Sequence, residues 1–129
     1  MKMAIVSLAL LLGAVSFALW GSDTVCDICR EILDFESSLP ESAEGIDESL
    51  KRELMKKGRA IAEKWDDRGA LLAAFVPSQS FTAQRHALDA LIKLIELEND
   101  DEYAAMRAQL KTYTKSIYDA ERFGILSIF

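Results

Sequence analysis

Two cysteines, Cys26 and Cys29, are the residues of this chain best suited to chemistry. They are the only cysteines in the sequence, and two residues separate them. The C-x-x-C spacing is typical of thiol oxidoreductases, in which a helix N-terminus lowers the pKa of a thiol. That chemistry belongs where a strand leads into a helix, and no strand-like run precedes Cys26. A thiol redox function is therefore the least favoured of the functions that the sequence suggests.

Other chemistry finds little support in the residue types. The single histidine, His86, has no second histidine and no cysteine near it in sequence, so neither a metal site nor a catalytic base is predicted there. The sequence also lacks a glycine-rich phosphate loop and a nucleophile paired with a base. We therefore expect a protein that is not an enzyme and that uses no metal or cofactor.

The two cysteines lie in a predicted amphipathic helix that runs from about Thr24 to about Ser37. Apolar residues recur there at three- and four-residue spacing, which gathers them on one side of a helix. Pro40, which cannot continue a helix, follows shortly after. Both sulfurs are therefore expected near one face, among the apolar residues Val25, Ile28, Ile32 and Leu33.

The segment Val-Cys-Asp-Ile-Cys-Arg-Glu-Ile-Leu at residues 25–33 resembles the opening helix of saposin-like (saposin B-type) proteins. In that family a C-x-x-C pair begins a bundle of four or five helices. Ile46, Leu50 and Leu54 look like the second family helix, with leucine where a cysteine is expected. The family normally has six cysteines, the first two of which bridge to a pair near the C-terminus. The resemblance implies a degenerate, lipid-interacting member that lacks four of the six usual cysteines.

The first 18 residues have the features of a secretory signal peptide. Lys2 supplies a positive start, and the run that follows is apolar and uncharged. Ser16 and Ala18 favour cleavage after Ala18, and a cut near Gly21 is the second choice. An uncleaved anchor is the alternative, because the uncharged stretch is just long enough to span a bilayer. We expect a secreted, extracellular protein with a single helical domain at residues 19–129.

The compartment that a signal peptide implies is oxidising, and thiols rarely persist there. Cys26 and Cys29 are therefore expected in a disulfide, either with each other or with another subunit. A bridge between residues three apart strains the first helical turn, so pairing within the chain should open the helix start.

The charge of the chain excludes one class of partner. Without the leader, 111 residues remain, and the loss of Lys2 leaves 14 basic against 21 acidic side chains, a net charge of −7. Nucleic acid is disfavoured, since phosphate binding depends on Lys and Arg. Binding to a lipid or membrane surface should be favoured at acidic pH, where carboxylates lose their charge and basic residues keep theirs.

Further helices are predicted after a solvent-exposed linker at residues 37–45. They should span about 46–65, 70–76, 82–98 and, after a capping box at Asn99 and Glu102, the stretch that ends at Gly124. Gly69 is expected in the left-handed conformation that ends helices. The predicted fold class is all-α, a compact bundle of four to five amphipathic helices.

The candidate contact residues fall into an apolar and a basic group. Apolar side chains that are costly to leave in water are candidates for lipid or partner contact: Leu71, Leu72, Phe75, Leu94, Leu97, Phe123, Ile125, Leu126, Ile128 and Phe129. Basic residues are candidates for headgroup contact, with a solvated helix face as the alternative: Lys51, Arg52, Lys56, Lys57 and Arg59. The favoured function is non-catalytic lipid interaction. The alternative is a helical protein–protein interaction module that forms a homodimer or binds a receptor.

Cleavage of the leader predicts that the released protein begins at Leu19. N-terminal sequencing and intact mass measurement of protein recovered from the medium check this. Recovery of a membrane-embedded chain that still begins at Met1 would contradict it and favour the anchor.

Overall fold

The chain folds into five helices, which confirms the all-α class. The structure, a computed structural model, describes the backbone of residues 1–128 and the side chains of residues 1–123, and it contains no strand in that range. The helices are α1 (Lys2–Ser37), α2 (Glu48–Asp67), α3 (Gly69–Phe75), α4 (Ser78–Glu96) and α5 (Tyr103–Ile128).

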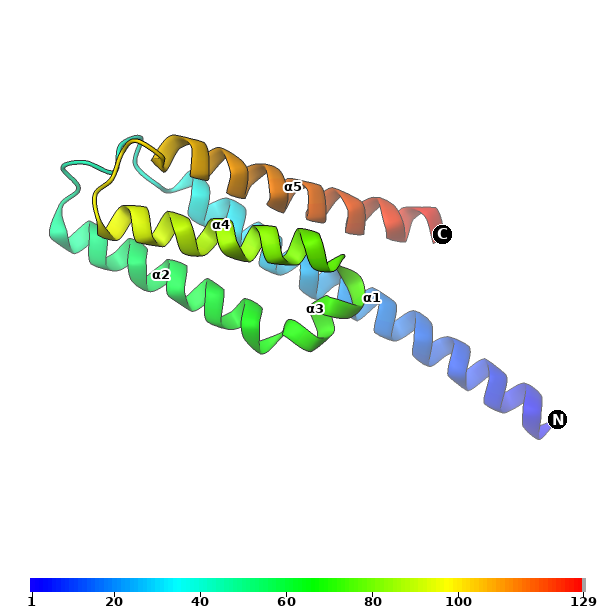
Figure 1. Cartoon of the computed structure of the whole chain (residues 1–129). Helices are drawn as coiled ribbons and strands as arrows, with labels where there is room; N and C mark the ends of the chain where they lie inside the picture. The colour runs from blue at the N-terminus through cyan, green and yellow to red at the C-terminus, as the bar shows by residue number, and fades with distance from the viewer. Residues whose placement is uncertain (129) are drawn as a thin grey trace.

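The four long helices alternate in direction and pack side by side, and α3 is a short crosspiece between α2 and α4 (Figure 1). Short connections between helices force neighbours to be antiparallel, which is the topology of an up-and-down bundle. α5 packs extensively against α1 and α4, and α2 packs against α4, whereas α1 and α2 contact each other less. The seam between α1 and α2 is therefore the most open of the four.

An apolar core fills the space between these helices, because each contributes a stripe at helical spacing. The largest fully buried apolar side chains are Trp65, Tyr103, Ile28, Ile32, Leu72, Leu88, Leu91, Ile95 and Leu110. Trp65 of α2 stacks on Phe81 of α4 with ring centroids 5.1 Å apart. Burial of such side chains is worth about 1.5–3 kcal/mol each, so the core supplies the main force that assembles the bundle.

Arg107 of α5 closes the C-terminal end of α1. Its guanidinium donates to the backbone oxygen of Glu36 at 3.0 Å, to that of Pro40 at 2.9 Å and to Oε1 of Glu36 at 3.2 Å. The hydroxyl of Tyr103 donates to the same Pro40 oxygen at 2.6 Å. The last carbonyls of a helix have no partner within it. Arg107 and Tyr103 supply donors at this end of α1, and the cation also suits the negative end of the helix dipole.

Three expected helix ends differ from the structure. Gly69 has no positive φ and instead begins α3, because α2 already ends at Asp67. α5 continues past Gly124 to Ile128, since one glycine weakens a helix without stopping it. Asn99 does not cap α5, which begins at Tyr103; its side-chain oxygen accepts the N–H of Asp101 at 3.1 Å in a local turn.

The end of α4 uses a residue that sequence reasoning did not single out. Glu98 has a φ of 51°, the left-handed conformation that usually belongs to glycine. The N–H of Asn99 bonds to the oxygen of Leu94 and that of Glu98 to the oxygen of Ile95, the two bonds of a Schellman motif. α4 is therefore terminated by backbone hydrogen bonds, and the chain turns there toward α5.

The first part of α1 projects beyond the bundle (Figure 1). It contains the one helical stretch among the described residues that is long and apolar enough to cross a membrane, with a mean hydropathy of 2.3. Residues 1–20 are almost entirely exposed, and burial begins at Gly21 and Ser22. Gly21 lies against the ring of Phe75, which a Cβ at that position would overlap. The bundle therefore starts close to the predicted cleavage after Ala18.

Replacing Arg107 by alanine should destabilise the bundle by about 3 kcal/mol, because it leaves the buried Glu36 carboxylate without its ion-pair partner. The side chains of Arg107 and Glu36 are only 20% and 10% exposed. Urea denaturation followed by circular dichroism measures the effect. The control is Arg122→Ala, an exposed arginine on the same helix. Equal losses of stability in the two variants would contradict this role of Arg107.

Candidate functional site

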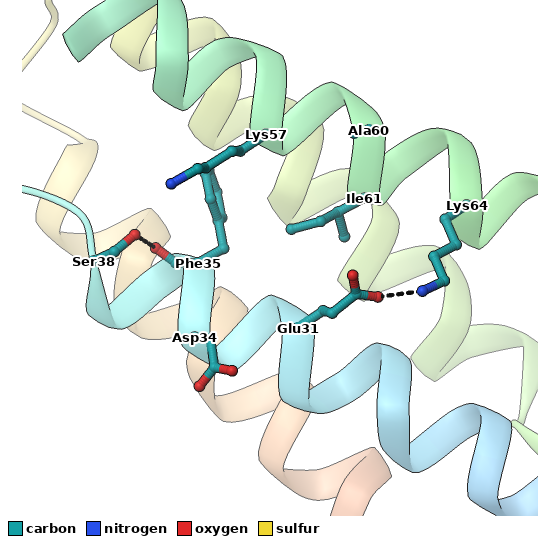
Figure 2. A pocket seen from close by; sticks show the side chains of 8 residues that line it. All are labelled: Glu31, Asp34, Phe35, Ser38, Lys57, Ala60, Ile61 and Lys64. Carbon is teal, nitrogen blue, oxygen red and sulfur yellow. Dashed lines mark hydrogen bonds and ion pairs between the residues drawn. The ribbon is translucent and has the colours of Figure 1, made fainter.

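The open seam between α1 and α2 forms a groove of about 430 Å³ (Figure 2). Phe35 and Ile61 form its apolar floor and are nearly buried. Its charged residues are Glu31 and Asp34 from α1 and Lys57 and Lys64 from α2; Ser38 and Ala60 complete the lining.

The charges of the groove are largely matched within it. Lys64 donates to Glu31 across the seam at 2.8 Å, and Lys57 lies 3.2 Å from Glu53 of its own helix. The part of the chain with described side chains has no group of three or more His, Cys, Asp or Glu suited to a metal. The groove thus offers an apolar floor between charged side chains, most of which are paired.

A second cavity, of about 410 Å³, lies where the α3–α4 turn meets α5. Its lining includes Phe75, Val76, Ser80, Ser116, Ile117 and Glu121, and we refer to it as the end cavity. Burial raises the pKa of the Glu121 carboxyl, and a hydrogen bond with Ser22 partly offsets the rise. A carboxylate that has lost part of its hydration favours a proton or a cation as partner.

Both cysteines are free thiols in the structure, and the start of α1 is regular helix rather than opened. Cys29 is fully buried, and burial raises the pKa of its thiol to about 12. Burial also raises the pKa of Cys26, which is half-buried. Thiolate, the nucleophile in redox chemistry, is therefore scarce at both positions. The disulfide stays a prediction, and for a bridge to another subunit only Cys26 is accessible.

A buried polar pair next to Cys29 was missed by the sequence reasoning. Gln84 of α4 donates to the hydroxyl of Thr114 of α5 at 2.7 Å, and both side chains are buried. Each occupies a core position of its helix: Gln84 is four residues before Leu88, and Thr114 three before Ile117. These core positions could have predicted the pair, since a polar residue on an apolar stripe must find a hydrogen-bond partner when it is buried.

The predicted apolar contact residues are separated by the fold. Leu72 and Leu94 are buried in the core at 0% and 7% exposure, so neither side chain is accessible for contact in this closed bundle. Leu71 and Phe75 are half-buried in α3. The structure leaves two of the group exposed, Leu97 and Phe123. Ile125, Leu126, Ile128 and Phe129 lie outside the residues whose side chains are described.

Leu97 and Phe123 lie at opposite ends of the bundle, because α4 and α5 are antiparallel (Figure 1). The end with Phe123 also carries α3 and the point where the leader leaves the bundle. Only this end combines the predicted contacts Leu71, Phe75 and Phe123.

The basic candidates lie on the first half of α2, away from α3. Arg52, Lys56, Lys57 and Arg59 are exposed, and Lys51 is half-buried. The ion pair between Lys57 and Glu53 is more than half exposed, as expected for a solvated helix face. The structure therefore does not bring the basic group and the apolar end together.

Comparisons of the chain with models of known protein families, with curated proteins and with solved structures found no match. The saposin resemblance of residues 25–33 stays a prediction.

Replacing Glu121 by glutamine should stabilise the bundle at neutral pH and have little effect near pH 4, the ordinary pKa of a glutamate. Burial raises the pKa of Glu121 in the folded state. The stability linked to its protonation is complete below the unfolded-state pKa and is lost as the pH rises through the folded-state pKa. Thermal melts of both proteins across this range measure the difference.

The control is Asp119→Asn, which removes the same charge from an exposed position of the same helix. A glutamine variant that is no more stable than the parent at neutral pH would contradict the prediction.

Proposed function

We propose that this chain is a non-catalytic lipid-interacting protein and that one end of its bundle touches the membrane surface. The observation that carries the proposal is the exposure of large apolar side chains at that end. Leu19, Trp20 and Phe123 are 37%, 53% and 66% exposed. Together with α3 they form what we call the apolar end.

These residues come together because α1 and α5 are antiparallel and in contact. Ser22 of α1 lies close enough to Glu121 of α5 to affect its pKa, so the residues just before Ser22 and just after Glu121 lie at the same end. Half-buried Phe75 of α3 closes this end next to Gly21. At the opposite end the chain forms the loops between α1 and α2 and between α4 and α5, which are rich in acidic residues.

The energy available at the apolar end supports reversible association rather than insertion. Full burial of a large apolar side chain is worth about 1.5–3 kcal/mol, and Leu19, Trp20 and Phe123 are already partly covered. A net charge of −7 on residues 19–129 opposes approach to an anionic membrane at neutral pH. Acidification removes part of this repulsion, so binding should be stronger at acidic pH.

The resemblance of residues 25–33 to saposin-like proteins is further support for lipid interaction. In that family the opening C-x-x-C pair bridges to cysteines near the C-terminus, and in this chain Cys26 lies near Glu121 of the C-terminal helix. Cys26 thus lies beside the C-terminal helix, as the resemblance implies, although no cysteine on that helix forms a disulfide with it. The apolar leader, compatible with a signal peptide, is the support for secretion.

The alternative function, a protein–protein interaction module, rests on a different feature. The groove between α1 and α2 has an apolar floor and charged sides, which is the form of a surface that accepts an amphipathic helix. Dimerisation or receptor binding through this groove would leave the apolar end free.

Co-sedimentation of the released protein with anionic vesicles tests the proposal. The double variant Trp20→Ser with Phe123→Ser should bind at least about tenfold more weakly, since about 1.4 kcal/mol of lost burial corresponds to a factor of ten. Leu97→Ser is the matched control, because Leu97 is 62% exposed at the opposite end. Binding of the parent protein should be stronger near pH 4.5 than near pH 7, as carboxylates are protonated.

Two results would contradict the proposal. One is the absence of vesicle binding at every pH, and the other is an equal loss of binding in the Leu97→Ser control. Concentration-dependent dimerisation without lipid, measured by analytical ultracentrifugation, would then favour the interaction module.

A further inference from the structure

The end cavity combines one acidic group with apolar and aromatic walls. Among its described lining residues Glu121 is the only charged one. Phe75, Val76 and Ile117 supply apolar surface, and Ser80 and Ser116 supply two hydroxyls. Its volume of about 410 Å³ falls within the range of small-molecule sites.

Glu121 is not neutralised by the surrounding protein. Burial raises its pKa, and no basic side chain contributes to the shift. The titratable groups that face it from α1 are Cys26 and Cys29, whose own pKa values are raised, so both are neutral in the acidic and neutral range. α3 and α4 contribute no charged residue to the described lining. Among the residues whose side chains are described, Glu121 is therefore the one charged group of the cavity, and no basic side chain offsets it.

This composition selects among ligands. An anion would meet Glu121 without any lysine or arginine in the lining. A calcium or magnesium ion prefers about six or more oxygen ligands, and one carboxylate with two hydroxyls supplies too few. A primary ammonium would use the Glu121 carboxylate and the Ser80 and Ser116 hydroxyls as acceptors, but it would leave the apolar walls without a contact. A quaternary ammonium needs no acceptors, and its methyl groups suit apolar and aromatic surface beside a negative charge.

We propose that the end cavity binds the quaternary ammonium group of choline, with Glu121 as its counter-ion and Phe75 as its aromatic wall. The cavity lies at the apolar end, because its lining comes from the α3–α4 turn and from the part of α5 beside it. At this end of the bundle the choline group belongs to the headgroup of a choline lipid. This assignment of the lipid as its source rests on the proposed function.

The pH dependence separates this site from general attraction to lipid. Protonation removes the counter-ion, so choline binding should weaken on acidification, beginning at the raised pKa of Glu121. Association with an anionic membrane should strengthen over the same range, because the whole chain loses negative charge. The two effects have opposite signs and can be measured independently.

The test is a titration of the full chain, held in a maltoside detergent that has no ammonium group, with choline chloride at neutral pH. Amide NMR signals report the site, and inorganic phosphate is titrated separately as an anionic probe. Choline should shift the signals of Ser80, Ser116 and Glu121, and phosphate should not. Glu121→Gln should weaken choline binding about tenfold or more through the lost charge attraction. Asp119→Asn, the same change at an exposed position of α5, should leave it unchanged.

A second arm measures binding of the released protein to neutral phosphatidylcholine vesicles and to anionic vesicles that lack choline. Choline binding that Glu121→Gln does not weaken, or no choline binding at all, overturns the inference even if vesicles are bound. Choline binding without any vesicle binding supports the ammonium site and overturns its lipid source, and with it the proposed function. Loss of choline-vesicle binding in Glu121→Gln, with anionic vesicles still bound, supports both.

Discussion

The contact between α1 and α5 is the interaction on which the rest of the structure depends. These helices come from the two ends of the folded domain and make the most extensive contact in the bundle. Arg107 fixes one end of the contact at Glu36 and Pro40, and at the other end Glu121 lies beside Ser22. Because the helices are antiparallel, this contact brings the residues that follow the leader to the same end as the last part of α5. The apolar end and the end cavity both result from it.

The all-α fold was predictable because each helix carries a strong periodic signal of its own. Val25, Ile28 and Ile32 of α1 and Leu88, Leu91 and Ile95 of α4 are buried as their spacing indicates. The ends of helices were less predictable, because capping depends on a few local bonds. Gly69 looked like a helix stop and begins α3, whereas Glu98 took the left-handed position after α4.

The candidate site was predicted only in part, because sequence identifies apolar residues but not the side of the bundle on which each one lies. Leu72 and Leu94 belong to the core, and Leu97 lies at the far end from Phe123. The end cavity depends on Ser80 of α4 and Glu121 of α5, which are far apart in sequence. Gln84 and Thr114 show the same limit, since only the packing of α4 on α5 makes them partners.

We propose that the bundle docks on a membrane by its apolar end, and the two tryptophans of the chain test this orientation most directly. Trp20 is exposed at the apolar end, and Trp65 is buried in the core. In the processed protein, Trp65→Phe leaves Trp20 as the only reporter, and Trp20→Phe leaves Trp65. With brominated phosphatidylcholine vesicles, the fluorescence of Trp20 should shift to shorter wavelength and be quenched, and that of Trp65 should not change. Quenching of Trp65, or vesicle-bound protein in which Trp20 is not quenched, would contradict docking by the apolar end.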